Sequence, residues 1–425
     1  MTTLPPAGCG MPPRSRESLR LPELRLAVRA RAVGNWLGSL PWWVQVVLVY
    51  GSARLYSMIV LIAAARRQMP SPWAQGSPSY GEFINFWDSG WYARIHDDGY
   101  PAELPRGDDG TVLENQWAFY PLFPATVRLF STMTGTGWNP GAPLLATAYG
   151  FAAALIIYRI FRLRAQHRDA LWAVGLIAFF PTSPILQIPY AESLHLMLLA
   201  LALYLVMTGR FLSAVPVVVL MCLARPAGVP FAAMLGALLL LGLAAKGDVG
   251  GRPNSAWASG RLAVLTGVAG MAALSWPVVA WVGTGVPDAY VQTETAWRGS
   301  ELTLFLPWLS AAVGLLGPIL GPLALAVLIA GFAGLLLSTA GRSLGLPLRL
   351  WCTAYLLFLA AFWNPQTSTF RILLPLFPLA LAAVLISDAR AYRWLAVAAC
   401  ACLQVVWVAW LWAWVPLFGS GDYSP

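Results

Sequence analysis

The stretch from Phe83 to Pro101, FINFWDSGWYARIHDDGYP, concentrates side chains that are able to do chemistry. It holds three Asp, one His, two Trp and two Tyr directly after the first long apolar run of the chain. A carboxylate in such a place can accept the proton of a hydroxyl group, and aromatic faces can cover a sugar ring. The stretch is therefore the first candidate for a site.

The spacing from Glu82 to His96 predicts one amphipathic helix, at about 100° per residue. Its polar stripe would carry Asn85, Asp88, Tyr92 and His96, and its other side Phe83, Ile84, Phe86, Trp87, Trp91 and Ile95. Such a helix would lie in the membrane interface and turn Asp88 towards a cavity. The alternative is an interfacial belt helix whose polar residues are merely solvated. Asp97 and Asp98 end the helix beside Gly99, where we expect a solvated turn.

A second aromatic stretch, QWAFYPLFPATVRLF from Gln116 to Phe130, is too short and too broken by proline to cross a membrane. We expect it to be re-entrant or interfacial, with a short helix that includes Arg128 after Pro121 and Pro124. Either it packs as a hydrophobic plug against the spans, or Tyr120 and its neighbours contact a substrate.

Three polar islands interrupt the apolar remainder of the chain. In YAES, Glu192 opens a helix, where it either caps the first turn or takes part in a site. In LARPAG and TSTFRILLPLFP, Arg225 and Arg371 lie at the ends of apolar runs. Each Arg needs a counter-ion there, from Glu192, Asp88 or an anionic ligand. Guanidinium groups match phosphate oxygens, so the islands fit either structural ion pairs or an anion site.

The composition indicates the class of fold that must position these residues. With 58% hydrophobic residues, 21 Trp and only 11% charged residues, the chain is predicted to be an all-α polytopic membrane protein. Apolar runs of suitable length predict about eleven transmembrane helices. We place them near residues 43–64, 142–162, 170–186, 190–208, 210–224, 227–246, 262–284, 308–338, 350–363, 370–386 and 394–416.

Charge along the chain predicts the orientation. The connections on one side of the predicted spans carry Arg and Lys, as do residues 1–40 with six Arg, whereas most acids fall on the other side. Arg66 and Arg67 are exceptions. We therefore expect a cytoplasmic tail at 1–40, disordered or lying on the anionic leaflet, and one membrane domain at 41–418. That domain includes a long extracytoplasmic loop at 66–141, and residues 419–425 form an extracytoplasmic tail.

Several classes of site are not indicated. Cys9, Cys222, Cys352, Cys400 and Cys402 form no CxxC pair, and His96, His167 and His195 have no metal-ligand spacing. We therefore expect no metal and no cofactor, although Asp97 and Asp98 could bind a cation. The net charge of +9 comes from scattered Arg rather than a basic surface, so we expect no nucleic-acid partner.

The motifs WDSGWY, GYP, AFYPLFP, PYAES, ARPAG and FRILLP occur in this order between about residues 83 and 375. In this order they resemble the PIG-V family, the GPI mannosyltransferase 2 type, in the GT-C class of membrane glycosyltransferases. Ala191 departs from the Ser or Thr that the family usually shows in PYAES. Arg in place of Lys and abundant Ala and Gly suggest a bacterial member in a plasma membrane, which would have no GPI precursor.

The resemblance implies an inverting mannosyltransferase that uses a polyprenyl-phosphate sugar and has its active site on the extracytoplasmic face. It implies that Asp88 is the catalytic base. Arg225 and Arg371 are then candidates for holding the donor phosphate. Candidates for substrate binding are Trp87, Trp91, Tyr92, His96, Tyr120 and Glu192. The acceptor stays open between a lipid-linked glycan, a glycolipid and a protein.

Two other interpretations remain from the sequence. A transporter or flippase of an amphipathic lipid-linked substrate would also need many spans and an Arg near a broken helix pair. An inactive scaffold would bind a lipid or a partner without turning it over. No internal repeat of the kind found in many transporters is evident, which weakens the first of these.

Overall fold

The computed structural model describes residues 38–246, 255–299 and 302–416. The chain divides into two compact units, residues 1–45 and residues 46–425. In the first unit the described residues hold the start of helix α2, where Val44 N donates to Pro41 O at 3.0 Å. Apart from residues 38–40, the predicted cytoplasmic tail lies outside the described residues, and so does the predicted tail at 419–425.

Helices make up the fold, and the described residues contain no β-strand beyond one isolated bridge between Arg106 and Val112. The long apolar helices are α2 (Trp42–Ala65), α6 (Trp138–Arg162), α8 (Glu192–Met207), α9 (Phe211–Ala224), α10 (Gly228–Lys246), α11 (Ser255–Ala273), α14 (Leu306–Leu337), α16 (Leu346–Phe362) and α19 (Arg390–Trp407). Shorter helices connect them: α7 (His167–Ala178), α12 (Ser275–Thr284), α13 (Ala289–Arg298), α15 (Thr339–Ser343), α17 (Thr369–Ile372) and α18 (Pro378–Val384). The prediction of an all-α fold is confirmed for the described part of the chain.

Among the described residues, five helical stretches are long and apolar enough to cross a membrane: Trp42–Ala65, Trp138–Arg162, Ser259–Thr284, Leu306–Leu337 and Arg390–Trp412. They support a multi-pass membrane protein, in agreement with the composition. The other predicted spans coincide with shorter helices, and the run at 370–386 is broken into α17, a 3-10 turn and α18, where Pro375 and Pro378 interrupt regular helix. The total of eleven spans therefore stays a prediction.

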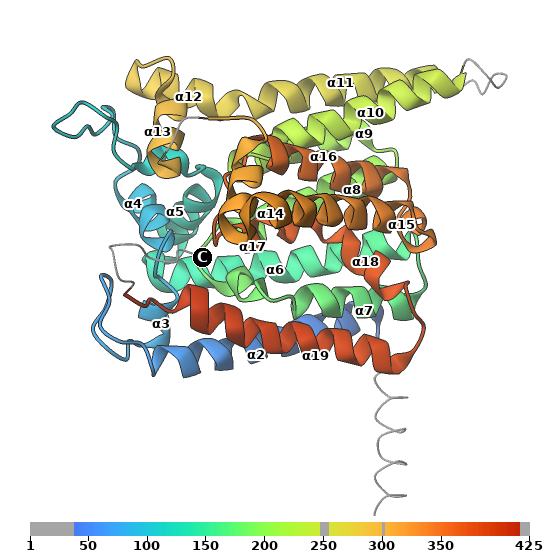
Figure 1. Ribbon diagram of the computed structural model, residues 1–425, viewed down its shortest axis with the longest axis horizontal. Coiled ribbons are helices and arrows are strands. Elements are labelled where there is room, and N and C mark those ends of the chain that lie inside the picture. The colour runs from blue at the N-terminus through green and yellow to red at the C-terminus, as the bar shows by residue number, and fades with distance from the viewer. Residues whose placement is uncertain (1–37, 247–254, 300–301, 417–425) are drawn as a thin grey trace, which may run out of the picture. The chain divides into compact units, whose positions relative to one another are not determined.

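Lipid-facing and core-facing surfaces are distinct in residues 46–425. Large apolar side chains on the outside include Leu315, Ile319 and Val282, as expected where the solvent is lipid. Inside, α6 packs along α8, and α10 packs between α11 and α16 (Figure 1). Small residues permit these close contacts, since a Cβ on Gly228 would lie only 2.7 Å from the Cβ of Ala273.

The segment between α2 and α6 carries short helices, as its proline and aromatic content suggested. They are α3 (Tyr80–Phe83), α4 (Ser89–Asp97), the 3-10 turn η1 (Gln116–Ala118) and α5 (Leu122–Thr134). Arg128 of α5 donates from Nε to His96 O at 2.6 Å and from Nη2 to Ile95 O at 3.2 Å. It thereby satisfies carbonyl groups at the C-terminal end of α4 and joins the two short helices.

The predicted continuous helix from Glu82 to His96 is wrong. Helix α3 ends at Phe83 and α4 begins at Ser89, so five residues of irregular backbone separate them. Trp87 has the left-handed φ of 60°, which no helix accommodates. Its indole is buried and donates from Nε1 to Trp412 O at 2.8 Å, a contact across 325 residues that fixes the bend.

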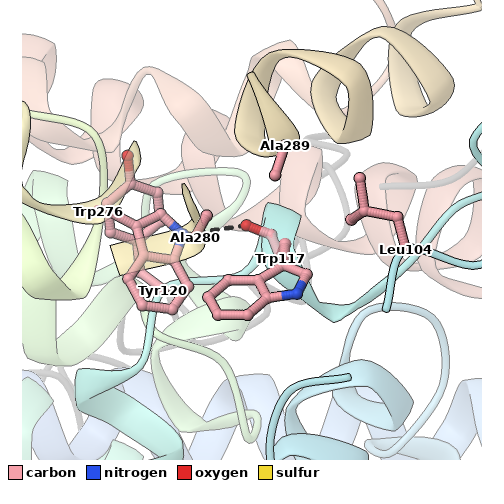
Figure 2. Packing of buried hydrophobic residues seen from close by; sticks show 6 residues of the cluster. All are labelled: Leu104, Trp117, Tyr120, Trp276, Ala280 and Ala289. Carbon is pink, nitrogen blue, oxygen red and sulfur yellow. Dashed lines mark hydrogen bonds between the residues drawn. The ribbon is translucent and has the colours of Figure 1, made fainter. Parts of the chain in front are cut away.

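A buried aromatic cluster fastens α12 and α13 to the loop that precedes α5. Its members are Leu104, Trp117, Tyr120, Trp276, Ala280 and Ala289 (Figure 2). Trp276 Nε1 donates to Trp117 O at 3.0 Å, so the contact has a polar as well as an apolar component. The cluster holds the loop and the α12–α13 pair together as one wall beside α4.

Candidate active site

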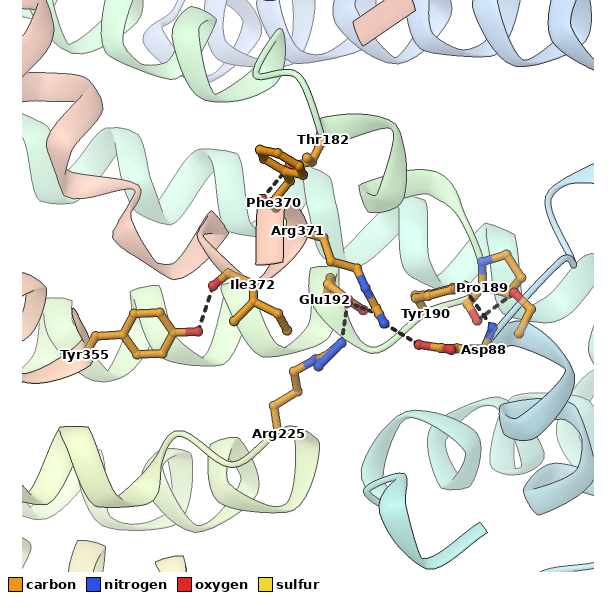
Figure 3. Close-up of polar contacts among 11 residues, drawn as sticks. Asp88, Thr182, Pro189, Tyr190, Glu192, Arg225, Tyr355, Phe370, Arg371 and Ile372 are labelled. Atoms are coloured by element: carbon orange, nitrogen blue, oxygen red, sulfur yellow. Dashed lines mark hydrogen bonds and ion pairs between the residues drawn. The ribbon is translucent and has the colours of Figure 1, made fainter. Parts of the chain in front are cut away.

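Four charged side chains from distant parts of the chain form one ion-pair network (Figure 3). Arg371 Nη2 donates to Asp88 Oδ2 at 2.5 Å, and its Nη1 donates to Glu192 Oε1 at 2.9 Å. Arg225 Nη2 donates to the same oxygen of Glu192. Two guanidinium groups thus neutralise two carboxylates. The prediction that each Arg has an acidic counter-ion is confirmed.

Asp88 owes its orientation to the break before α4. It takes the N-cap position of that helix, yet its carboxylate makes no capping hydrogen bond and instead turns to Arg371. The backbone N–H of Asp88 donates to Tyr190 Oη at 2.9 Å. The bend at Trp87 and the bond to Tyr190 therefore set the direction of the carboxylate.

Glu192 and the two arginines lie at interruptions of the apolar helices, as their sequence context predicted. Glu192 is the first residue of α8, after the turn that carries Tyr190. Arg225 follows the last residue of α9 in extended conformation, with φ of −161° and ψ of 160°, as expected before a proline. Arg371 lies in α17, and its Cζ lies 5.2 Å from the centroid of the Tyr190 ring. Glu192 therefore serves in an ion network rather than as a simple helix cap.

Burial divides the network into an inner and an outer part. Glu192 is 5% exposed and Arg371 8%, whereas the Asp88 side chain is 17% exposed. Buried ions are tolerated when each has an opposite charge and further hydrogen bonds. The Arg225 side chain is 20% exposed, so Asp88 and Arg225 form the accessible edge of the charge network, and Glu192 and Arg371 are its shielded inner members.

A pocket opens beside the inner members of the network. Its polar lining comes from Glu192, His195, Arg225, Tyr355 and Arg371, and its apolar lining from Leu196, Ile372, Leu374 and Pro375. Within the described part of the chain, four buried lining atoms have no hydrogen-bond partner: Glu192 Oε2, His195 Nε2, Arg225 Nε and Arg371 Nε. Buried polar atoms without partners are costly, and their gathering at one pocket is typical of a site for a polar ligand.

Among the aromatic candidates for substrate binding, Tyr92 belongs most clearly with the network. Its ring is buried and lies 6.1 Å from the ring of Tyr190, measured between centroids. Burial raises the pKa of Tyr92, and the charges of Arg225, Glu192, Asp88 and Arg371 also act on its hydroxyl. The side chain is therefore a neutral phenol within electrostatic reach of all four ions.

The other aromatic candidates form walls around α4. Trp91 stacks on Phe119 with centroids 6.0 Å apart and meets the ring of Trp297 edge-on at 5.3 Å. Tyr120 belongs to the buried aromatic cluster, and its Oη lies 3.3 Å from Tyr290 Oη. Contacts of these two side chains with a substrate stay predictions.

Trp87 and His96 lie outside the ion network. Trp87 packs on Trp73 and bonds to Trp412, which gives it a structural role at the bend. His96 uses both ring nitrogens, Nδ1 towards Asp97 at 2.7 Å and Nε2 towards Ser131 Oγ at 3.2 Å. These contacts account for both side chains without a substrate.

Sequence reasoning missed three residues that the structure brings to the network. Tyr190 supports Asp88 and Arg371, His195 lines the pocket, and Tyr355 Oη donates to Ile372 O at 2.8 Å beside Arg371. His195 follows Glu192 by three residues in a helix, so helical spacing could have identified it. No local signal pointed to Tyr355.

The described residues contain no group of three or more His, Cys, Asp or Glu able to hold a metal ion. This includes Asp97 and Asp98, which lie at the exposed end of α4. The expectation that the reaction needs no metal stays a prediction.

Comparison with known proteins gives limited guidance. No family model matches the chain, and no curated protein matches it. Matches among solved structures include the oligosaccharyltransferase of the archaeon Archaeoglobus fulgidus. One, a complex with Zn and sulfate, is 17% identical, with 85% of this chain and 53% of that chain covered and a TM-score of 0.46.

Two further structures of that archaeal protein give similar values. The one tethered to an acceptor peptide is 14% identical, with 85% and 55% of the two chains covered and a TM-score of 0.43. The complex of AglB with an inhibitory peptide and a dolichol-phosphate is 15% identical, with 85% and 56% covered and a TM-score of 0.44. This chain thus spans about half the length of the structures that it matches. At TM-scores this low the likeness does not assign a fold family, and the PIG-V resemblance stays a prediction.

Proposed function

We propose that this protein is an inverting membrane glycosyltransferase. It would move a sugar, mannose by the motif resemblance, from a polyprenyl-phosphate donor to an acceptor hydroxyl on the extracytoplasmic face of a bacterial plasma membrane. The observation that carries the proposal is the accessible carboxylate of Asp88 at the edge of a network with Arg371, Glu192 and Arg225. A base, two phosphate-binding cations and a polar pocket are what this transfer requires.

The reaction needs one base and one anion site. The acceptor oxygen attacks C1 of the donor sugar while Asp88 accepts the hydroxyl proton, and the bond between C1 and the phosphate oxygen breaks. The electron pair of that bond leaves with the polyprenyl phosphate, and attack from the opposite face inverts C1. Because the phosphate is already a good leaving group, no general acid is required, in contrast to hydrolysis of an ordinary glycoside.

Arg371 connects donor binding to the activity of the base. In the network its guanidinium group bonds Asp88 Oδ2, so that oxygen is not available to an acceptor hydroxyl. A donor phosphate would compete for the N–H groups of Arg371 and Arg225, which line the pocket and whose Nε atoms have no partner. Once Arg371 turns to the phosphate, Asp88 is released to accept a proton from the acceptor hydroxyl.

Replacement of Asp88 by Asn tests the proposal directly. In proteoliposomes supplied with polyprenyl-phosphate-mannose and extracted membrane lipids, we expect D88N to lose about 100-fold or more of the transfer rate, because the amide cannot accept the proton. The matched control is D98N at the exposed end of α4, which should transfer normally. Thermal unfolding of both variants shows whether the fold is kept.

Two outcomes would contradict the proposal. Full transfer by D88N would remove Asp88 as the base. Movement of the intact lipid-linked sugar across sealed vesicles, with no covalent change, would favour the transporter or flippase interpretation instead.

A further inference from the structure

Helix α13 turns one polar and aromatic face towards α4 and the loop that precedes α5. Tyr290, Thr293, Glu294 and Trp297 are spaced three and four residues apart, so they share one side of the helix. Thr293 is completely buried, and it exchanges hydrogen bonds with the Asn115 side chain at 3.1 and 3.3 Å. Together with the aromatic cluster, this contact fixes which face of α13 turns inward.

The inward face of α13 contacts α4, the helix that Asp88 precedes as the N-cap residue. Trp297 meets the rings of Trp91 and Phe119 edge-on, each at 5.3 Å between centroids. Trp91 follows Asp88 by three residues, about one turn of α4. Hence α13 contacts α4 one turn beyond the proposed base.

Glu294 lies on this face between Tyr290 and Trp297, and the ion network does not use it. Its side chain is partly buried and forms no ion pair with any residue that the structure describes. Burial raises the pKa of Glu294, while the Tyr290 hydroxyl, Arg298 and Arg225 act in the opposite direction. Glu294 follows Tyr290 by four residues and precedes Trp297 by three, so helical spacing places it on the same side of α13 as these two residues.

A partly buried carboxylate among tryptophan and tyrosine rings suits the recognition of sugar hydroxyls. Carboxylate oxygens accept hydrogen bonds from hydroxyl groups, and ring faces pack against the C–H faces of a pyranose. In the proposed transfer Arg225 and Arg371 hold the donor phosphate, so the face of α13 is left for the acceptor. A negatively charged side chain here would repel a phosphate and favour a neutral polyol.

We propose that the inward face of α13, with Glu294 and Trp297, and the neighbouring Trp91 of α4 form the subsite for a neutral acceptor sugar. Glu294 orients the acceptor by accepting hydrogen bonds from its hydroxyl groups, while Asp88 takes the proton of the attacking one. The assignment rests on the proposed glycosyl transfer and adds the chemical class of its acceptor.

Steady-state kinetics with two acceptor probes test this assignment. The donor is polyprenyl-phosphate-[³H]mannose, and the acceptors are octyl α-D-mannopyranoside and the same glycoside with a 6-phosphate group. For E294Q we expect the KM of the neutral acceptor to rise about tenfold, as for loss of a hydrogen bond to a charged group, with the donor KM unchanged. For the wild type we expect a strong preference for the neutral probe, which E294Q should weaken.

Controls separate the role of the carboxylate from folding. D288N removes an exposed acid at the start of the same helix and should leave both KM values unchanged. Y290F keeps Glu294 but removes the hydroxyl beside it, and it should raise the acceptor KM less than E294Q does. Thermal unfolding of all variants identifies any that are misfolded.

Each result decides the assignment. An unchanged acceptor KM in E294Q, an equal rise in the donor KM, or wild-type preference for the phosphorylated probe would overturn it. Transfer by the wild type to extracted lipids but not to the neutral glycoside would overturn the neutral-sugar subsite alone. Absence of transfer to every acceptor would instead refute the proposed function, and the subsite with it.

Discussion

At the scale of single residues, the site depends on Arg371. Its planar guanidinium group places two nitrogens on two different carboxylates, Asp88 at 2.5 Å and Glu192 at 2.9 Å. Arg225 pairs with Glu192, and Tyr190 supports both Asp88 and Arg371 without carrying charge. One side chain therefore connects the proposed base to the inner acid and, by way of Glu192, to the second cation.

Substitutions of Arg371 separate its charge from its geometry. R371Q removes the cation that pairs with Asp88 and leaves Glu192 with Arg225. Breaking a buried ion pair in this way costs about 3–5 kcal/mol of stability. R371K keeps the charge but lacks the fork that reaches both acids. We therefore expect R371Q to lose both stability and transfer, and R371K to lose transfer while keeping most of its stability.

Thermal unfolding in detergent and transfer assays on the same preparations check this expectation. R66K, at an exposed position after α2, is the control and should behave as the wild type does. Equal losses of stability in R371K and R371Q would show that Arg371 serves the fold alone.

At the scale of elements, the sequence predicted the convergence of the charged residues but not the shape of the segment that carries Asp88. Each Arg at the end of an apolar run called for a counter-ion, with Glu192 and Asp88 among the candidates, and these four side chains do meet. The helical spacing from Glu82 to His96 predicted one continuous helix, which is wrong because spacing along the sequence takes no account of contacts with distant residues. The left-handed Trp87 is stabilised by Trp412, whose position no local pattern reveals.

Helix α13 escaped prediction for a different physical reason. It is short and polar, so it carries none of the apolar signal by which membrane helices are recognised. Its inward face is defined by Asn115, by Trp91 and by the aromatic cluster, all from an earlier part of the chain. Tertiary packing, and no local pattern, shows which face of α13 turns inward.

The α12–α13 pair can be displaced by one methyl group. A Cβ added to Gly283 in α12 would lie 2.6 Å from Cη2 and 2.9 Å from Cζ2 of the Trp117 ring. Overpacking of this kind costs about 1–3 kcal/mol, because Trp117 is itself held by the aromatic cluster. We expect G283A to lower the unfolding temperature and to raise the acceptor KM, since α13 moves with α12.

Gly267 in α11 provides the matched control, because a Cβ added there meets no atom within 4 Å. G267A should keep the wild-type stability or gain slightly, by up to about 1 kcal/mol from helix propensity. A G283A protein with unchanged stability and an unchanged acceptor KM would show that the α12–α13 pair does not position the subsite.

At the scale of the whole molecule, two ionic clusters differ in kind. The cluster around Arg371 adjoins a pocket with unpartnered polar atoms, whereas Arg393 is paired with Asp169 at 2.8 Å and with Asp388 at 2.9 Å near the starts of α7 and α19. The connections around Arg393 are basic and were predicted to be cytoplasmic. The first cluster suits binding of a ligand, and the second suits joining helices.

The charge pattern of the sequence predicts that the two clusters face opposite sides of the membrane, and labelling of single cysteines tests this orientation. In a variant with all five native Cys replaced, Asp108→Cys lies on the exposed loop of residues 66–141, and Arg168→Cys lies on an exposed basic connection. We expect a membrane-impermeant maleimide to label the first in intact cells and the second only after permeabilisation. Asp88 would then act on the side where polyprenyl-phosphate sugars meet extracytoplasmic acceptors. The reverse labelling pattern would place the proposed base in the cytoplasm, where the positive-inside bias would no longer explain the charges.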